Sequence, residues 1–201
     1  MKRYAFIDVQ NTESTTNQLL GFVIDWQKMH KYLKEKWGCE KIFFYSGIQN
    51  GDNVKALEYE ELSKLGYIVR AKPYFIYKNQ DQIIKISCPK CNTELTHKVS
   101  KGVKWKSNCD VEFAVDATNH IQKGVEYLFF TGDGDFEYLA RDTAEKSVKV
   151  YIISSARKIK TAPRYFVSRL SSKLRDLVAE KRNKVFFIDI NDWKFQIKRD
   201  V

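Results

Sequence analysis

Short apolar runs rich in strand-forming residues alternate with helical patterns along most of the chain. Because a parallel connection must cross back over its sheet, strands separated by helices predict a parallel sheet that is covered on both faces. The alternation therefore predicts an α/β fold, a three-layer α/β/α sandwich with a mainly parallel sheet. We expect strands at 3–9, 41–46, 67–71, 125–131, 148–154 and 185–190, and helices at 26–37, 53–65, 109–122 and 135–146.

One segment interrupts the alternation. Residues 78–107 are polar and rich in lysine, and alternating residues such as Ile83 and Lys85 suit a β-hairpin. A chain of 201 residues is the size of one domain that carries a small insertion. We therefore expect a single domain over 1–201 with an inserted, cysteine-containing hairpin over 78–107.

Two further expectations concern packing. Helical periodicity places Leu57, Leu62 and Leu65 in the core. The tail over 194–201 is expected to be loosely held, as chain ends often are.

The charge balance narrows the class of partner. Lys and Arg number 35 against 25 Asp and Glu, which gives a net charge of +10 and a field that attracts polyanions such as nucleic acid. The alternative is that excess lysine only keeps the protein soluble. No apolar run approaches the roughly 20 residues that cross a bilayer, so we expect no membrane span and no signal peptide.

The cysteines favour a reducing, cytoplasmic location over a disulfide framework. Cys88-Pro-Lys-Cys91 is half of a zinc ribbon, and tetrahedral Zn²⁺ needs four ligands. His97 and Cys109 are the remaining candidates within the chain. Three alternatives are open: a site of three cysteines and one histidine, an all-cysteine site shared by two chains of a homodimer, or a metal-free turn.

Acidic residues follow two of the predicted strands and begin one helix. Asp8 closes the first strand, with Asn11 close behind; Asp133 and Asp135 follow the fourth strand, and Asp110 begins the helix at 109–122. Ligands of open parallel sheets bind at the carboxyl ends of the strands. Clustered carboxylates repel unless a cation lies between them, and oxygen ligands suit Mg²⁺ or Mn²⁺, the ions of phosphodiester hydrolysis.

Two details qualify this acidic set. Gly132 and Gly134 permit a sharp strand-to-helix turn, but Gly-Asp-Gly-Asp is also an ordinary turn in which Asp135 caps a helix. Asp116 lies six residues after Asp110, a rotation of about 240° on a helix. The two carboxylates therefore cannot share a helix face.

Three segments together resemble the NYN domain proteins, the LabA-like branch of the PIN-like nucleases. They are Tyr4-Ala-Phe-Ile-Asp-Val-Gln-Asn11, Trp105-Lys-Ser-Asn-Cys-Asp-Val-Glu-Phe-Ala-Val-Asp-Ala117 and Thr131-Gly-Asp-Gly-Asp-Phe136. The resemblance implies a PIN-like, Rossmann-like α/β fold and a metal-dependent ribonuclease site. Its functional pattern carries over onto Asp8, Asn11, Asp110, Asp133 and Asp135.

Three further residues lie at or near the same segments, two with an expected supporting role and one that departs from the family pattern. Asp116 matches a recurrent acid of the family, and we expect it and Asn108 to support the acidic residues from behind. Cys109 stands where such proteins usually have a small aliphatic residue. Its thiol either binds metal or packs.

Basic and aromatic residues of the insertion suggest how RNA is held. Lysine contacts phosphate and aromatic rings stack on unpaired bases, which points to Lys104, Trp105 and Lys106. Arg157 and Lys158 follow the fifth strand and lie near the same sheet edge. The alternative is a solvated hairpin with Trp105 packed on its own strands.

The combined interpretation is a metal-dependent endoribonuclease that acts on single-stranded or structured RNA. Its main alternative is a non-catalytic RNA-binding or adaptor protein that retains the acidic pocket. A small-molecule phosphohydrolase is the third class, but its nucleophilic Asp lies two residues before a second Asp, whereas Asp8 is followed by Val9 and Gln10.

Overall fold

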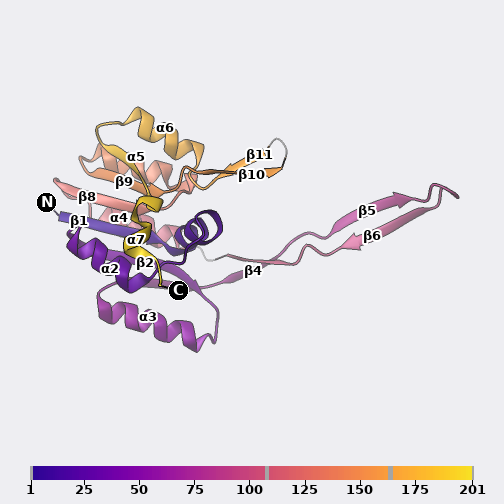
Figure 1. The fold of residues 1–201 in the computed structure, drawn as a ribbon, viewed down its shortest axis with the longest axis horizontal. Coiled ribbons are helices and arrows are strands. Elements are labelled where there is room, and N and C mark those ends of the chain that lie inside the picture. The colour runs from indigo at the N-terminus through magenta and orange to yellow at the C-terminus, as the bar shows by residue number, and fades with distance from the viewer. Residues whose placement is uncertain (1, 107–108, 163–164, 201) are drawn as a thin grey trace.

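The computed structural model describes residues 2–106, 109–162 and 165–200, and at 76, 104–106, 160–162 and 165–167 it describes the backbone alone. Within these ranges six parallel strands form one sheet in the order β12-β9-β8-β1-β2-β3 (Figure 1). The predicted α/β sandwich is confirmed. The strands are β1 (Lys2–Asp8), β2 (Cys39–Ile48), β3 (Ile68–Pro73), β8 (Val125–Phe130), β9 (Lys149–Ser154) and β12 (Val185–Asp189).

Helices cover both faces of the sheet because successive strand residues point to opposite sides. On β1, Ile7 packs into one apolar core and Phe6 into the other. The first core includes side chains from α2 (Trp26–Glu35), α3 (Asn53–Leu65) and α7 (Lys194–Ile197). The second includes side chains from α4 (Asp110–Asn119), α5 (Glu137–Glu145) and α6 (Ser172–Glu180).

Local capping sets where the predicted helices begin and end. Asp25 accepts hydrogen bonds from the backbone of Gln27 and Lys28, both at 3.0 Å, and so caps the start of α2. Gly66 ends α3 in the left-handed conformation, with φ +115°, a geometry that favours glycine. In the described part of the chain, no helix combines the length and the apolar character needed to span a membrane.

The polar stretch after β1 is helical. It forms α1 (Val9–Glu13) and continues as a π-helix, η1 (Ser14–Leu19). Thr12 explains why a polar segment stays close to the sheet: its buried hydroxyl donates to the carbonyls of Asp8 at 2.6 Å and Phe130 at 3.2 Å. The helix is therefore fixed between the ends of β1 and β8.

Two hairpins leave the carboxyl edge of the sheet. The first, which we call the arm, follows β3 and consists of β4 (Phe75–Lys78), β5 (Gln82–Ser87), β6 (Glu94–Val99) and β7 (Val103–Lys106). It extends far from the body (Figure 1) and begins slightly before the predicted insertion. The second hairpin, β10 (Lys158–Ala162) with β11 (Tyr165–Ser168), follows β9 and had no clear signal in the sequence.

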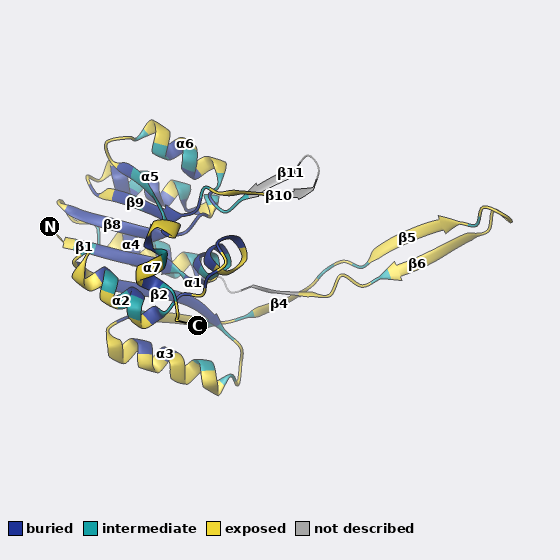
Figure 2. Cartoon of the chain, viewed as in Figure 1, coloured by how far each residue is buried: buried dark blue, intermediate teal, exposed yellow. Residues whose placement is uncertain are grey.

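Two packing expectations were wrong. Leu62 is buried, but Leu57 and Leu65 are 61% and 41% exposed, because only one side of α3 contacts the sheet (Figure 2). The tail is not loose either. Ile197 is fully buried in the core, and its carbonyl accepts a hydrogen bond from the backbone of Asp25 at 2.8 Å.

Candidate active site

Asp8 stands where the central strand ends and α1 begins. Its Oδ1 accepts a hydrogen bond from the backbone of Asn11 at 3.1 Å, the ordinary bond of a helix cap. Its Oδ2 accepts one from the Thr131 hydroxyl at 3.4 Å, on the neighbouring strand end. The carboxylate is therefore held between β1 and β8.

The surroundings of Asp8 disfavour its charge. Burial is the main cause and the negative charges of Asp110 and Asp133 add to it, while the hydrogen bonds from Asn11 and Thr131 oppose them. The net effect raises the pKa of Asp8 to about 7. Three carboxylates thus act on one another at this point, an arrangement that a bound cation would relieve.

The loop after β8 is built by its own side chains. The backbone of Asp133 donates to the Thr131 hydroxyl at 3.1 Å, and the backbone of Asp135 donates to Asp133 Oδ1, also at 3.1 Å. Asn11 joins this loop to α1, since its Oδ1 accepts from the backbone of Gly132 at 2.9 Å. Asn11 thus fixes the distance between the two acidic segments.

Gly132 has no room for a side chain. Its carbonyl accepts a hydrogen bond from the backbone of Ser171 at 2.9 Å, which brings the segment before α6 against the loop. A Cβ at this position would lie 2.0 Å from the carbonyl oxygen of Arg169 and 2.6 Å from Ser154 Oγ. The close contact explains the glycine without reference to its dihedral angles.

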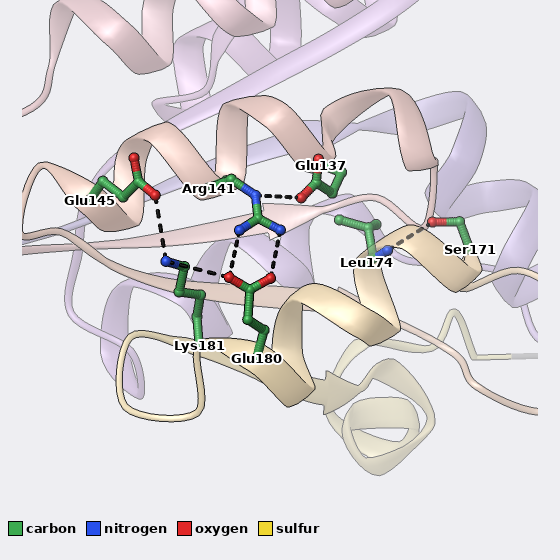
Figure 3. A network of polar contacts seen from close by, with 7 residues as sticks. All are labelled: Glu137, Arg141, Glu145, Ser171, Leu174, Glu180 and Lys181. Carbon is green, nitrogen blue, oxygen red and sulfur yellow. Dashed lines mark hydrogen bonds and ion pairs between the residues drawn. The ribbon is translucent and has the colours of Figure 1, made fainter.

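Polar contacts between α5 and α6 support this junction (Figure 3). Arg141 donates to Glu137 on its own helix at 2.8 Å and to both carboxylate oxygens of Glu180 on α6, at 2.7 and 2.8 Å. At the other end of α6, Ser171 Oγ accepts from the backbone of Leu174 at 3.2 Å. The end of α6 is therefore anchored to α5, and Ser171 caps the start of the helix beside its contact with Gly132.

These segments surround a cavity of about 250 Å³, here called the acidic cavity. Its carboxylates come from β1, the loop after β8 and the first residue of α4. The guanidinium of Arg169 also lines the cavity. The lining residues are Asp8, Gln10, Asn11, Ser14, Asp110, Asp133 and Arg169. A smaller pocket of about 20 Å³ adjoins it, shares Asp8, Gln10 and Asp110, and is also lined by Tyr45, Ser46, Gly47, Cys109, Phe113 and Phe136.

The structure thus brings Asp8, Asn11, Asp110 and Asp133 together, but not Asp135. The side chain of Asp135 is exposed and does not line the acidic cavity. Asp133 caps the short helix η2 (Gly134–Phe136) by accepting from the backbone of Asp135, which lies within that helix.

Asp116 and Cys109 have packing partners behind the cavity. Asp116 accepts from the Tyr45 hydroxyl at 3.1 Å and forms an ion pair with Arg70, also at 3.1 Å. Cys109 is buried, and its thiol donates to the carbonyl of Ser46 at 3.4 Å. Asp116 thus contacts Tyr45 and Cys109 contacts Ser46, two residues that line the smaller pocket. Asn108 lies outside the described residues.

Three lining residues had no signal in the sequence. Gln10 and Ser14 reach the cavity because the segment after β1 is helical, and Arg169 reaches it because the second hairpin returns there. The Arg169 guanidinium donates to Gln18 Oε1 at 2.5 Å, a contact across 151 positions of chain. Only the assembled fold shows such a pairing.

The donor set fits a hard divalent cation that keeps part of its water. Among the described residues no three His, Cys, Asp or Glu side chains converge as a ready set of metal ligands. Mg²⁺ in enzymes usually takes one or two carboxylates and completes its shell with water and substrate phosphate. A buried carboxylate whose pKa is raised, next to two further carboxylates in a cavity open to solvent, meets that requirement.

The residues expected to bind zinc are dispersed. Cys88 and Cys91 lie at the far end of the arm, whereas Cys109 is buried in the body. His97 stands on β6 opposite Ile84, three positions from the last pair of the ladder. The structure therefore does not bring either candidate to the two thiols.

The residues expected to bind RNA lie on the two hairpins. Arg157 and Lys158 are exposed at the start of the second hairpin. Lys104, Trp105 and Lys106 belong to β7, at the base of the arm, where the backbone alone is described. Because both hairpins follow the carboxyl ends of parallel strands, they leave the body on the side of the acidic cavity.

Comparisons with known proteins agree with this geometry. The Low amplitude and bright protein LabA of Synechococcus elongatus is 24% identical over 165 residues, which cover 78% of this chain and 77% of LabA. A Vibrio parahaemolyticus protein of unknown function has the same fold, with a TM-score of 0.57 at 18% identity and 94% of each chain covered. The NYN domain family model matches residues 3–171. The chain therefore belongs to the NYN domain family, which is a family of PIN-like nucleases.

Proposed function

We propose that this protein is a metal-dependent endoribonuclease that hydrolyses RNA phosphodiester bonds in the acidic cavity. One observation carries the proposal: Asp8, Asp110 and Asp133 line a single cavity, in which burial first and then the charges of Asp110 and Asp133 raise the pKa of Asp8 to about 7. Membership of a family of nucleases supports a role of this acidic cluster in the hydrolysis of phosphodiester bonds.

Asp8, Asp110 and Asp133 would hold Mg²⁺ or Mn²⁺ in this proposal. When bound, such an ion neutralises charge on a scissile phosphate and lowers the pKa of a water molecule. The carboxylates give the cavity its affinity for the ion, and Asn11 keeps two of them in register through its bond to Gly132. Arg169 supplies a positive charge on the same cavity, where a phosphate oxygen can accept hydrogen bonds from its guanidinium.

RNA would approach along the two hairpins. The chain carries a net charge of +10 although this cavity is acidic, so the surface attracts the polyanion while the cavity requires a cation. Arg157 and Lys158 lie exposed on the cavity side of the sheet, and the base of the arm carries Lys104, Trp105 and Lys106. We expect these residues to contact the RNA backbone and to stack on unpaired bases.

The Asp133→Asn variant tests the catalytic part. Asn also accepts the capping bond from the backbone of Asp135, so we expect an unchanged fold and the loss of Mn²⁺-dependent cleavage of RNA oligonucleotides. The neighbouring Asp135→Asn variant, whose side chain does not line the cavity, should keep most of the activity. Undiminished cleavage by the Asp133→Asn variant would refute the assignment. RNA binding by the parent protein without Mg²⁺- or Mn²⁺-dependent cleavage would instead support the non-catalytic alternative.

A second variant tests the path of the RNA. Replacing Arg157 and Lys158 together with Ala should weaken RNA binding and reduce the slope of log K against log salt by about two, if each contacts one phosphate. Arg182 and Lys184 offer a matched control, because both are exposed and precede β12 at the amino edge of the sheet. Equal losses of affinity in both double variants would mean that only net charge matters.

A further inference from the structure

We infer that the end of the arm is half of a zinc site, which a second copy of this chain completes. Cys88 and Cys91 supply two thiolates from each chain, and the two arms lie side by side with their ends around one tetrahedral Zn²⁺. This inference is independent of the proposed nuclease activity.

The turn that carries the two thiols is well formed. The backbone of Cys88 donates to the carbonyl of Thr93 at 3.0 Å, and the backbone of Asn92 donates back to the carbonyl of Cys88 at 2.9 Å. Asn92 adopts the left-handed conformation, with φ +55°. Cys91 is exposed, lies within side-chain hydrogen-bonding reach of Cys88, and its thiol donates to the Thr93 hydroxyl at 3.2 Å. The paired strands thus present two neighbouring thiols at the end of the arm.

Two thiols are half of what zinc requires. Structural Zn²⁺ sites are tetrahedral and closed by four protein ligands. Three ladder positions, at about 3.3 Å each, separate His97 from the end of the ladder, and Cys39 and Cys109 are buried in the body. Among the described residues of one chain, no third ligand joins the pair. An identical turn on a second chain would supply the missing two ligands.

The strands behind the turn also have an uncovered apolar face. The pairs Ile84 with His97 and Ile86 with Leu95 lie on one side of the β5–β6 ladder. Ile86 is 53% exposed and Leu95 61% exposed, and Figure 2 shows β5 and β6 as exposed. The opposite side is more polar and carries Lys85, Thr96 and Lys98.

Such a ribbon gains stability from a cover. A two-stranded hairpin is marginally stable in water when nothing packs on it. An arm from a second copy has the same apolar face and ends in the same pair of thiols. The metal would therefore hold together two faces that are already complementary.

The chemistry of the site balances. One Zn²⁺ and four thiols give a tetrathiolate of charge −2 and release four protons, or fewer where a thiol is already ionised. Lys90 lies between the two cysteines on each chain and is exposed. Two such lysines in the assembled site offset the remaining negative charge.

Molar mass and zinc content test the inference on the full chain. With excess Mg²⁺ to occupy the acidic cavity and with reductant present, adding Zn²⁺ should double the molar mass in light scattering and leave half an equivalent of zinc per chain. The Cys88→Ser and Cys91→Ser variants should stay monomeric, bind no zinc and keep the parent's RNA cleavage. Ser87→Ala is the matched control, because Ser87 precedes Cys88 on the polar side of the ladder and should dimerise as the parent does.

Several results would overturn the inference. A monomer with one zinc per chain would show a site closed within the chain, and a monomer without zinc would show no site. A dimer that persists in chelator, or in the Cys88→Ser variant, would have its interface elsewhere. Co²⁺ gives an independent readout, because four thiolates produce an intense charge-transfer band and the spectrum of a tetrahedral ion; oxygen ligands produce neither.

Discussion

At pH 8 in EDTA, we expect the Asp8→Asn variant to unfold at a higher temperature than the parent protein, and with Mn²⁺ present we expect it to cleave RNA far more slowly. Both results follow from the same property of the acidic cavity. Burial and the charges of Asp110 and Asp133 raise the pKa of Asp8 to about 7, so ionising this carboxyl costs the folded state up to about 4 kcal/mol. Asn removes the charge and still accepts the capping bond from the backbone of Asn11.

The pH dependence gives the sign of the effect. A carboxyl whose pKa is higher in the folded state contributes its full stability below the unfolded value of 3.8, and this contribution is lost as the pH rises to 7 and beyond. The advantage of the Asp8→Asn variant should therefore be absent near pH 4 and largest above pH 7. Thermal unfolding of both proteins from pH 4 to pH 8, in EDTA throughout, measures it.

Cleavage should fall on the order of 10²-fold or more, the cost typical of removing one group that stabilises charge in a transition state. Asp176, exposed on α6, provides the control: its replacement with Asn should change neither the pH dependence of unfolding nor the activity. The difference in unfolding temperature between the parent protein and the Asp8→Asn variant should grow from pH 4 to pH 8. A constant difference would contradict a raised pKa of Asp8.

The Gly132→Ala variant is expected to lose about 3 kcal/mol of stability, at the upper end of the range for overpacking. The new Cβ would lie 2.0 Å from the carbonyl oxygen of Arg169, so the backbone must separate there and break the bond between Gly132 and Ser171. Because that junction also positions Asp133 and Arg169, RNA cleavage should fall in the protein that remains folded. Urea denaturation and cleavage at a temperature well below the midpoint separate the two effects.

Gly134→Ala is the matched control for this experiment. Its Cβ would lie 3.0 Å from Ser171 Oγ, a side-chain atom that can move, and Gly134 does not have a positive φ. The loss of stability should therefore be much smaller than at Gly132. Equal losses of stability in the two variants would mean that the loop tolerates no side chain at either position, and that the contact with Arg169 is not the reason for the glycine at 132.

The order of layers and the residues at strand ends could be predicted because they depend on local patterns. Continuous apolar runs identify the buried strands, and helical periodicity identifies the helices without knowledge of the tertiary structure. The same patterns placed Asp8 and Asp133 after the ends of strands. They could not identify which faces would be covered, and so Leu57 and Leu65 were wrongly placed in the core and Ile197 in a loose tail.

The remaining features depend on contacts between distant segments. The helix after β1 consists of polar residues, and it is held by Thr12 through a bond to Phe130, 118 positions away. Arg169 enters the acidic cavity only because a hairpin without a sequence signal returns to it. Asp135 was expected in the site because it shares a motif with Asp133, but the direction of a side chain in a tight turn depends on which residue caps it.

Synthesis of the chain imposes an order on these contacts. Asp8 leaves the ribosome early, but Thr131, which bonds to it, is 123 positions later, and the contact that closes Gly132 needs Ser171. A growing polypeptide therefore has no complete acidic cavity until the segment through Ser171 has been made.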